Sequence, residues 1–281
     1  MTNSTFFAVE KSPHVSLIAE EIFRIGSFPV TNSLIMGVFG YALLIGLLVY
    51  VARSIKKGRK NRLVSAVQWV FEMLYSTVEQ VVGDKKIAKR LAPLPITLFF
   101  FIVIQYWLGI FPIIGPITID GVPLFRGLAA DLNVTFALAI VTMITAQIYA
   151  IKVHGFGGNA ARYFRNPFKD PAGAFEGILE LIAEFSRLVG LSLRLFGNVF
   201  AGEVLLAMIA FLTVWFSPLS LPPFMIFELF IGGVQAYIFF MLTVVFISLG
   251  IASHGHDNHA PKKDHSPAVR PKKPVMAGND T

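Results

Sequence analysis

Long apolar stretches alternate with short polar segments along most of this chain. Residues 31–52, 92–113 and 130–151 are almost continuously apolar over about 20 residues each, the length that one helix needs to cross a hydrocarbon core. Residues 63–82 differ, because their apolar side chains recur at helical spacing and leave a polar face on the opposite side. That stretch predicts an amphipathic helix lying at the membrane interface.

The last apolar region is too long for a single upright span. No proline follows Pro171 until Pro218, so one helix of about 46 residues is possible, roughly 69 Å long and more than twice the thickness of the core. Such a helix must tilt steeply, curve, or break near Gly190 or Gly197. We predict a long, steeply tilted helical hairpin over residues 171–252, with its second helix beginning at Phe224. The turn is predicted at three prolines, Pro218, Pro222 and Pro223.

The composition agrees with a chain that lies largely within a bilayer. Hydrophobic residues make up 55% of the 281 residues, charged residues 15%, and the mean hydropathy is +0.67. We therefore predict an all-α polytopic membrane protein with about five membrane-crossing helices and one interfacial amphipathic helix.

The positive charge is distributed unevenly. The net charge is +7, and most of the 24 Lys and Arg residues fall in segments that the alternation of spans places on one side of the membrane. By the positive-inside rule that side is cytoplasmic, so the charge indicates topology rather than nucleic-acid binding. We predict an external N-terminal arm at 1–30, a membrane domain at 31–253 and a disordered cytoplasmic tail at 254–281.

One basic residue, Arg194, lies in the middle of an apolar stretch, where its guanidinium cannot escape by losing a proton. On a helical wheel it borders a stripe of small residues formed by Ala183, Gly190, Gly197 and Ala201. A small-residue stripe lets another helix approach closely. The pattern leaves two interpretations open: docking of a neighbouring protein's helix, or ordinary packing within this chain.

Carboxylates lie on both sides of Arg194 in the sequence. Glu180 and Glu184 precede it by two to four turns, whereas Glu203 follows it, and Glu228 and Gln235 share one face of the returning helix. Two groups of carboxylates separated by a permanent positive charge have the layout of two offset aqueous half-paths that meet at a barrier.

Two further groups have simpler interpretations. Asp131 and Asn133 stand at the outer end of a predicted span, where they either cap a helix or polarise the mouth of a water path. The histidines of the tail lack a fourth ligand, and the chain has no cysteine, so we expect no functional metal site, no cofactor and no disulfide.

Three motifs resemble the a subunit of the membrane sector of F-type ATP synthases. They are LRLFGNVFAGE ending at Glu203, VQAYIFFMLT containing Gln235, and ADLNVT containing Asp131, with IKVHGFGG following later. The resemblance covers roughly residues 30–253, and the form FGNVFAGE is similar to bacterial members.

The resemblance implies a non-catalytic stator of the Fo sector with two offset half-channels that carry protons to and from a rotating ring of c subunits. It implies that Arg194 faces the ring, that Asn198 and Glu203 belong to the external half-channel, and that Gln235 lies close to the arginine. Glu180 matches an acid on the cytoplasmic side. Where Glu228 stands, some members have His and others an acid. Implied partners are the c-ring and the b-subunit peripheral stalk in a bacterial inner membrane, with ATP chemistry on other subunits.

Three other classes of function fit the sequence less well. A secondary transporter would use Arg194 to bind an anionic substrate, but it predicts an inverted internal repeat, and the sequence shows no convincing one. A structural scaffold would not need several intramembrane acids around one arginine. A soluble-type enzyme has no support from any phosphate-loop, metal or nucleophile motif.

Overall fold

The computed structural model of the chain is predominantly helical and describes residues 20–59, 61–110, 118–119, 122–123, 126–163 and 171–252. Within these ranges the seven α-helices are α1 (Asn32–Lys56), α2 (Arg62–Val82), α3 (Lys85–Leu91), α4 (Pro93–Ile110), α5 (Leu132–Tyr163), α6 (Pro171–Thr213) and α7 (Ser217–Ala252). Among the described residues, four helical segments are long and apolar enough to cross a membrane, and the last of them contains both α6 and α7. The prediction of an all-α polytopic membrane protein is confirmed.

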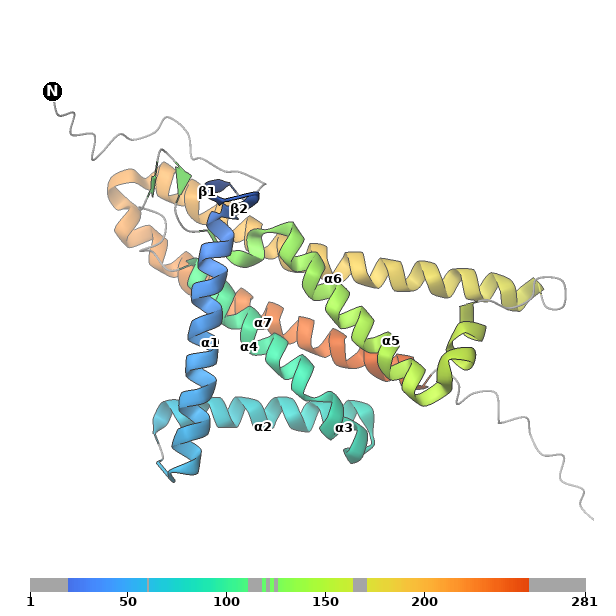
Figure 1. Cartoon of the computed structure of the whole chain (residues 1–281). Helices are drawn as coiled ribbons and strands as arrows, with labels where there is room; N and C mark the ends of the chain where they lie inside the picture. The colour runs from blue at the N-terminus through green and yellow to red at the C-terminus, as the bar shows by residue number, and fades with distance from the viewer. Residues whose placement is uncertain are drawn as a thin grey trace, which may run out of the picture.

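The interfacial helix predicted at 63–82 is α2. It lies across the lower end of α1 and does not run alongside it (Figure 1). Leu74 and Val78 are buried against the bundle, whereas Trp69 on the other side is 66% exposed. Asp84 then caps the short helix α3 by accepting from the backbone N–H of Lys86 at 2.7 Å.

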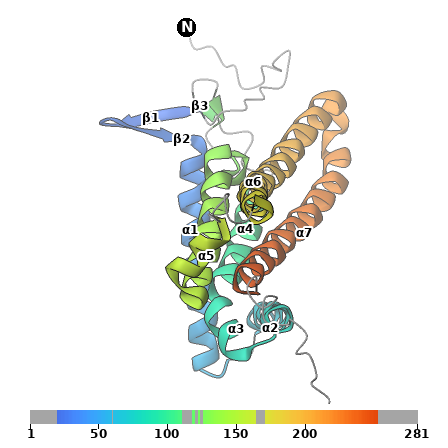
Figure 2. The same cartoon turned by 90° about the vertical axis from the view of Figure 1, so that its right-hand side faces the viewer.

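Of the three possibilities for the long helix, a break is wrong for the described structure. Helix α6 runs without interruption for 43 residues, through Gly190 and Gly197. In Figure 1 it crosses the direction of α1 at a steep angle, and Figure 2 shows α6 and α7 side by side, joined at one end. The inclination agrees with a helix too long for the core.

The hairpin turn was predicted at the wrong residues. The chain turns at η2 (Val214–Phe216), where Val214 has a φ of 36°, and Pro218, Pro222 and Pro223 all lie inside α7. Pro218 is the second residue of α7, where the missing N–H would have had no helical partner. Pro222 and Pro223 lie more than one turn farther along, and α7 continues through both of them. We call the η2 end of the hairpin the turn end, and the end with Pro171 and Ala252 the open end.

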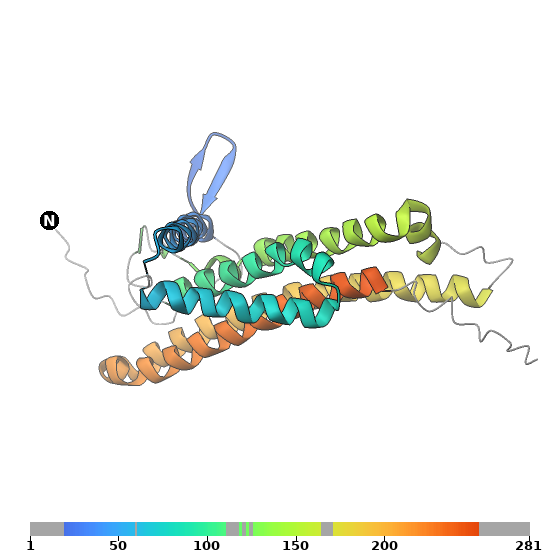
Figure 3. The same ribbon diagram turned by 90° about the horizontal axis from the view of Figure 1, so that it is seen from below.

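Two other elements differ from the sequence prediction. The end of the predicted external arm forms a hairpin of β1 (Glu21–Ile25) and β2 (Phe28–Thr31), which projects sideways from α1 (Figure 3). The span predicted at 130–151 is extended, because α5 continues to Tyr163 with a bend at Gly155, whose φ is 74°. A second short hairpin consists of β3 (Thr118–Ile119) and β4 (Val122–Pro123), and η1 (Leu128–Ala130) precedes α5. The proposed tail at 254–281 and most of the arm lie outside the described residues.

Helix α7 is central to the packing. Its buried residues Phe240, Val244 and Ile247 join a cluster with Leu74 and Leu91 from α2 and α3. Its residues Ala236 and Phe239 join a second cluster with α4, α5 and α6. Helices α4, α5 and α6 therefore have fixed positions relative to one another, and this framework holds the polar side chains described below.

Candidate functional site

The face of α6 that bears Arg194 is open. Arg194, Gly190, Gly197 and Ala201 are exposed, and a Cβ added at either glycine would meet no atom within 4 Å. The opposite face is closed, because Leu195 and its neighbours are buried in the second core cluster. Of the two interpretations of the stripe, packing against the described part of this chain is therefore wrong.

No ion pair or hydrogen bond links Arg194 to another residue within the described ranges. Gln235, which the resemblance implied to lie near it, is 1% exposed, and its Oε1 accepts from Nδ2 of Asn198 at 2.6 Å. Asn198 is one helical turn from Arg194 along α6, on the side that faces α7. The guanidinium thus remains available at the surface, beside a polar contact that joins α6 to α7.

Glu228 lies deeper in the interface between helices, where it is 3% exposed. Its Oε1 accepts a hydrogen bond of 2.5 Å from the hydroxyl of Tyr106 on α4. Two glycines make room for this pair: a Cβ on Gly202 would lie 1.9 Å from Glu228 Oε1, and a Cβ on Gly232 would lie 2.5 Å from the Tyr106 ring. The structure therefore brings together one of the predicted acids and a tyrosine from a separate helix.

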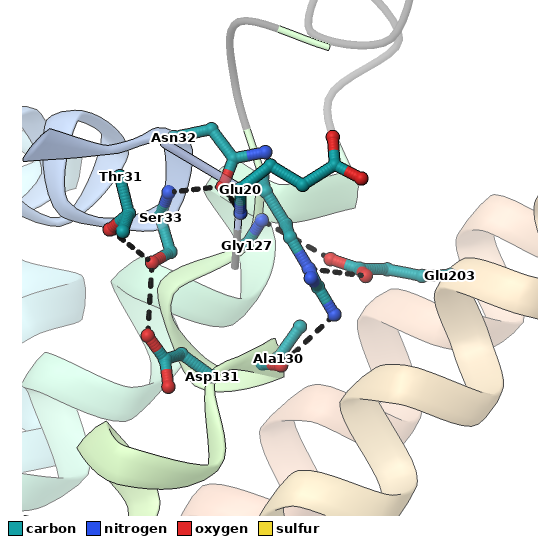
Figure 4. A network of polar contacts seen from close by, with 9 residues as sticks. Glu20, Thr31, Asn32, Ser33, Gly127, Ala130, Asp131 and Glu203 are labelled. Carbon is teal, nitrogen blue, oxygen red and sulfur yellow. Dashed lines mark hydrogen bonds and ion pairs between the residues drawn. The ribbon is translucent and has the colours of Figure 1, made fainter. Parts of the chain in front are cut away.

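Glu203 is held by the short segment that precedes α5 (Figure 4). Its Oε1 accepts from the backbone N–H of Gly127 at 3.2 Å, and its Oε2 lies 3.7 Å from Nε of Arg126. Arg126 is 9% exposed and also donates to the carbonyl of Ala130 at 3.3 Å. The acid thus connects the turn end of α6 to the entry of α5.

Asp131 belongs to the same network. Its Oδ1 accepts from the backbone N–H of Asn133 at 2.9 Å, so it caps α5, and its Oδ2 accepts from the hydroxyl of Ser33 at 3.1 Å (Figure 4). The capping interpretation is confirmed for Asp131. A role in shaping a water path remains a prediction, as it does for Asn133, whose side chain is exposed.

At the open end, the two predicted acids of α6 have different partners. Oε1 of Glu180 accepts from the Arg187 guanidinium at 3.0 Å on the same helix. Glu184 accepts from Nε2 of Gln147 at 2.7 and 2.8 Å, and from the hydroxyl of Tyr163, both on α5. Acids that appeared equivalent in the sequence therefore have different environments.

The polar groups thus form two sets along the hairpin. Toward the turn end lie Asn198 with Gln235, then Glu228 with Tyr106, then Glu203 with Arg126. Toward the open end lies the group around Glu184. Nineteen residues separate Glu184 from Glu203 on one continuous helix, a rise of about 28 Å, and Arg194 lies between them. The carboxylates can bind and release protons, and the amides and hydroxyls can hydrogen-bond to water.

Sequence reasoning did not identify Arg126, Gln147 and Tyr163 as site residues, and it gave Tyr106 no role. Gln147 is an amide inside a predicted span, a signal that could have identified it. The partners of Arg126 and Tyr106 follow from tertiary packing. Gln105, beside Tyr106, donates instead to the carbonyl of Gly37 at 3.0 Å. Across the described ranges, no three His, Cys, Asp or Glu side chains gather in a way that would hold a metal.

Comparison with known proteins gives consistent matches over most of the chain. A family model described as ATP synthase A chain matches residues 34–248. A protein from Acidothermus cellulolyticus named ATP synthase subunit a is 30% identical, over 88% of this chain and 88% of its own. Proteins of the same name from Aeromonas salmonicida and Stutzerimonas stutzeri are 32% and 33% identical, over 79% of this chain and 88% and 79% of theirs.

Proposed function

Because the chain belongs to the ATP synthase A chain family, whose members are membrane subunits of the Fo sector, we propose that it is the stator that conducts protons to and from a rotating ring of c subunits. In this proposal two half-paths, one from each side of the membrane, end at the ring at different positions. Proton flow then turns the ring, because a proton can pass from one half-path to the other only while it is bound to a c subunit of the rotating ring.

The observation that carries this proposal is the open face of α6. An exposed arginine in an apolar helix needs a partner, and a stripe of glycines without Cβ atoms lets a second helix approach the backbone. A carboxylate on a c-subunit helix would complement both features at once.

The outer half-path is proposed to follow the turn-end set. Protons enter past Asp131 and Glu203, pass Glu228, and reach the ring near Asn198 and Gln235. Four separate hydrogen-bonded pairs along this route support it, since each provides polar groups that can bind water between the pairs.

The inner half-path is proposed to lie at the open end, among Glu180, Glu184 and the groups around them. A c-subunit carboxyl loses its proton there and is briefly paired with Arg194. Between the paths the carboxyl must be neutral, because moving a charge through hydrocarbon costs at least about 3 kcal/mol. The permanent charge of Arg194 also repels a cation in the low-dielectric gap, so it blocks a direct leak.

The family and the apolar helices place the chain in a membrane as a multi-pass protein. We propose a bacterial plasma membrane, with the N-terminus outside and the C-terminus in the cytoplasm, so that the turn end faces outward. The b-subunit peripheral stalk is the proposed anchor that keeps the stator still, and ATP chemistry is assigned to other subunits of the complex.

Disulfide cross-linking tests the rotor contact directly, since the chain has no native cysteine. A cysteine replacing Gly197 should form a disulfide with a cysteine introduced on the exposed helix face of the c subunit. A cysteine replacing Val199, which is buried on the opposite face, should not. Cross-linking at Val199 but not at Gly197 would show that the rotor docks elsewhere.

A further inference from the structure

Helices α5 and α6 enclose a polar cluster near the open end of the hairpin. Nε2 of Gln147 lies 2.7 and 2.8 Å from the two carboxylate oxygens of Glu184 and 2.8 Å from the Tyr163 hydroxyl. Tyr163 in turn donates to Oε1 of Glu184, and Nδ2 of Asn159 donates to Oε1 of Gln147 at 3.0 Å. We call these four residues the Glu184 cluster.

The bend in α5 is what assembles the cluster. Gly155 adopts a φ of 74° and a ψ of 163°, a conformation that side-chain-bearing residues rarely adopt. After this bend the last turns of α5 lead back toward α6 (Figure 1), so that Asn159 and Tyr163 approach a carboxylate that Gln147 already contacts from the straight part of the helix. The bend at Gly155 and the extension of α5 to Tyr163 are therefore both needed to form the Glu184 cluster.

The neighbouring acid is placed differently. The Arg187 guanidinium donates to Oε1 of Glu180 at 3.0 Å, so a fixed positive charge stabilises this carboxylate in its ionised form. The hydrogen bonds to Glu184 come from neutral groups, an amide and a phenol. Protonation of Glu180 would break its ion pair with Arg187, whereas protonation of Glu184 breaks no ion pair.

We propose that Glu184 is the group that takes up the proton on the inner half-path, while Glu180 is mainly engaged by Arg187. This inference rests on the proposed function and specifies one of its steps. The proton leaves the c-subunit carboxyl, crosses by way of water and forms an O–H bond on Glu184. It then leaves as hydronium in cytoplasmic water, which restores the carboxylate. Water is required, because Glu184 and Arg194 are ten residues apart on α6, about 15 Å along the axis.

Gln147, Tyr163 and Asn159 act as positioning residues in this step. Gln147 and Tyr163 fix the direction of the Glu184 carboxylate, and Asn159 fixes Gln147 by occupying its amide oxygen. Glu184, Gln147 and Tyr163 are all partly exposed, so the helices do not fully enclose the cluster.

The first test measures passive proton conductance of inverted membrane vesicles that contain the assembled complex, after the catalytic sector has been stripped. Replacing Glu184 by Gln should lower the conductance by about a hundredfold or more, since a hundredfold is the low end of what a positioned proton-transfer group contributes. Glu180→Gln should cause a smaller loss. Glu176→Gln, an exposed acid two turns before Glu184 on α6, is the matched control and should conduct like the wild type. Conductance in Glu184→Gln equal to that of the control would overturn the inference.

A second test separates positioning from folding and remains informative if Glu184→Gln fails to assemble. Tyr163→Phe removes one donor and keeps the ring, so it should lower conductance several-fold while the amount of assembled complex stays constant. A cysteine replacing Gln147 should react with a membrane-impermeant thiol reagent added to the cytoplasmic side, whereas one replacing Ala150, which is 1% exposed, should not. Unchanged conductance in Tyr163→Phe, or no labelling at 147, would contradict the proposed route.

Failure of the inference and failure of the proposed function give different results. If Glu184→Gln conducts normally while cysteines at Gly197 still cross-link to the c subunit, the stator assignment stands and the inner acceptor is another group. If the cross-link is absent as well, the proposed function fails first.

Discussion

The Tyr106 hydroxyl donates to Glu228 Oε1 at 2.5 Å across the interface of α4 and α7, and both side chains are nearly inaccessible to solvent. A buried carboxyl without a donor would be strongly unfavourable, so the tyrosine is what makes an acid tolerable at this depth. The pair also connects two helices that are far apart in the sequence, and in the proposed function it stands at the middle of the outer half-path.

Tyr106→Phe removes the donor and keeps the ring. Leaving a buried acceptor unsatisfied should cost about 1–3 kcal/mol of stability and lower ATP-driven proton pumping several-fold. Thermal unfolding of the detergent-solubilised complex and pumping in inverted vesicles measure the two effects. Tyr41→Phe, at an exposed tyrosine, is the control. If Tyr106→Phe pumps protons like the wild type, the Tyr106 hydroxyl is not part of the outer half-path.

Gly202→Ala tests the space that Glu228 occupies. The new Cβ would fall 1.9 Å from Oε1 and 2.3 Å from Cδ of Glu228, so the carboxyl must move and its bond to Tyr106 must break. Overpacking of this kind typically costs about 1–3 kcal/mol. We expect a lower thermal midpoint and reduced pumping. Replacing Tyr106 and Gly202 together should cost less than the sum of the single changes, because both act through one contact.

Gly197 should behave in the opposite way, since nothing in the described chain lies near it. Gly197→Ala should leave the isolated chain as stable as before or raise its stability by about 0.5–1 kcal/mol, because alanine is the better helix former. Gly197→Leu should also leave the isolated chain folded but reduce the amount of c-ring that copurifies with it. Normal ring recovery with Gly197→Leu would argue against docking on this face.

The ion pairs of Arg126 and Arg24 should differ in strength. Arg126 is 9% exposed and joins Glu203 to the carbonyl of Ala130, whereas Arg24 is 66% exposed and pairs with Glu21 on the β1–β2 hairpin. Arg126→Ala strips partners from two acceptors in a partly enclosed site and should cost about 1–3 kcal/mol. Arg24→Ala should cost less than about 1 kcal/mol, as expected for a surface pair. Equal costs in thermal unfolding would show that the Arg126 contact is not maintained.

The sequence predicted most of the helices correctly, because hydropathy and helical periodicity depend only on residues close together in the chain. The length of α6, the amphipathic helix α2 and the small-residue stripe beside Arg194 all follow from periodicity within one segment. The turn at Val214–Phe216 was misplaced, since Pro218, Pro222 and Pro223 were interpreted as a turn although all three lie within α7. The extension of α5 beyond residue 151 was not predicted, because the apolar stretch ends there.

The contacts between helices were harder to predict. A helical wheel gives the direction of Glu228 or Glu184 on its own helix, but it does not say which helix lies opposite or at which height. The partners Tyr106 and Gln147 depend on how α4 and α5 pack beside the hairpin. Arg126 was not predicted as a site residue, because nothing in the sequence places a loop residue against Glu203.

The central claim is that the exposed Arg194 both faces the rotor and separates the two half-paths. The most direct measurement compares Arg194→Ala with the wild type in inverted vesicles, first for ATP-driven pumping and then for passive proton permeability after the catalytic sector is stripped. Arg24→Ala, which removes an arginine far from the stripe, is the control. The account predicts that Arg194→Ala assembles, fails to pump and retains a passive proton leak. Normal pumping by Arg194→Ala would contradict it.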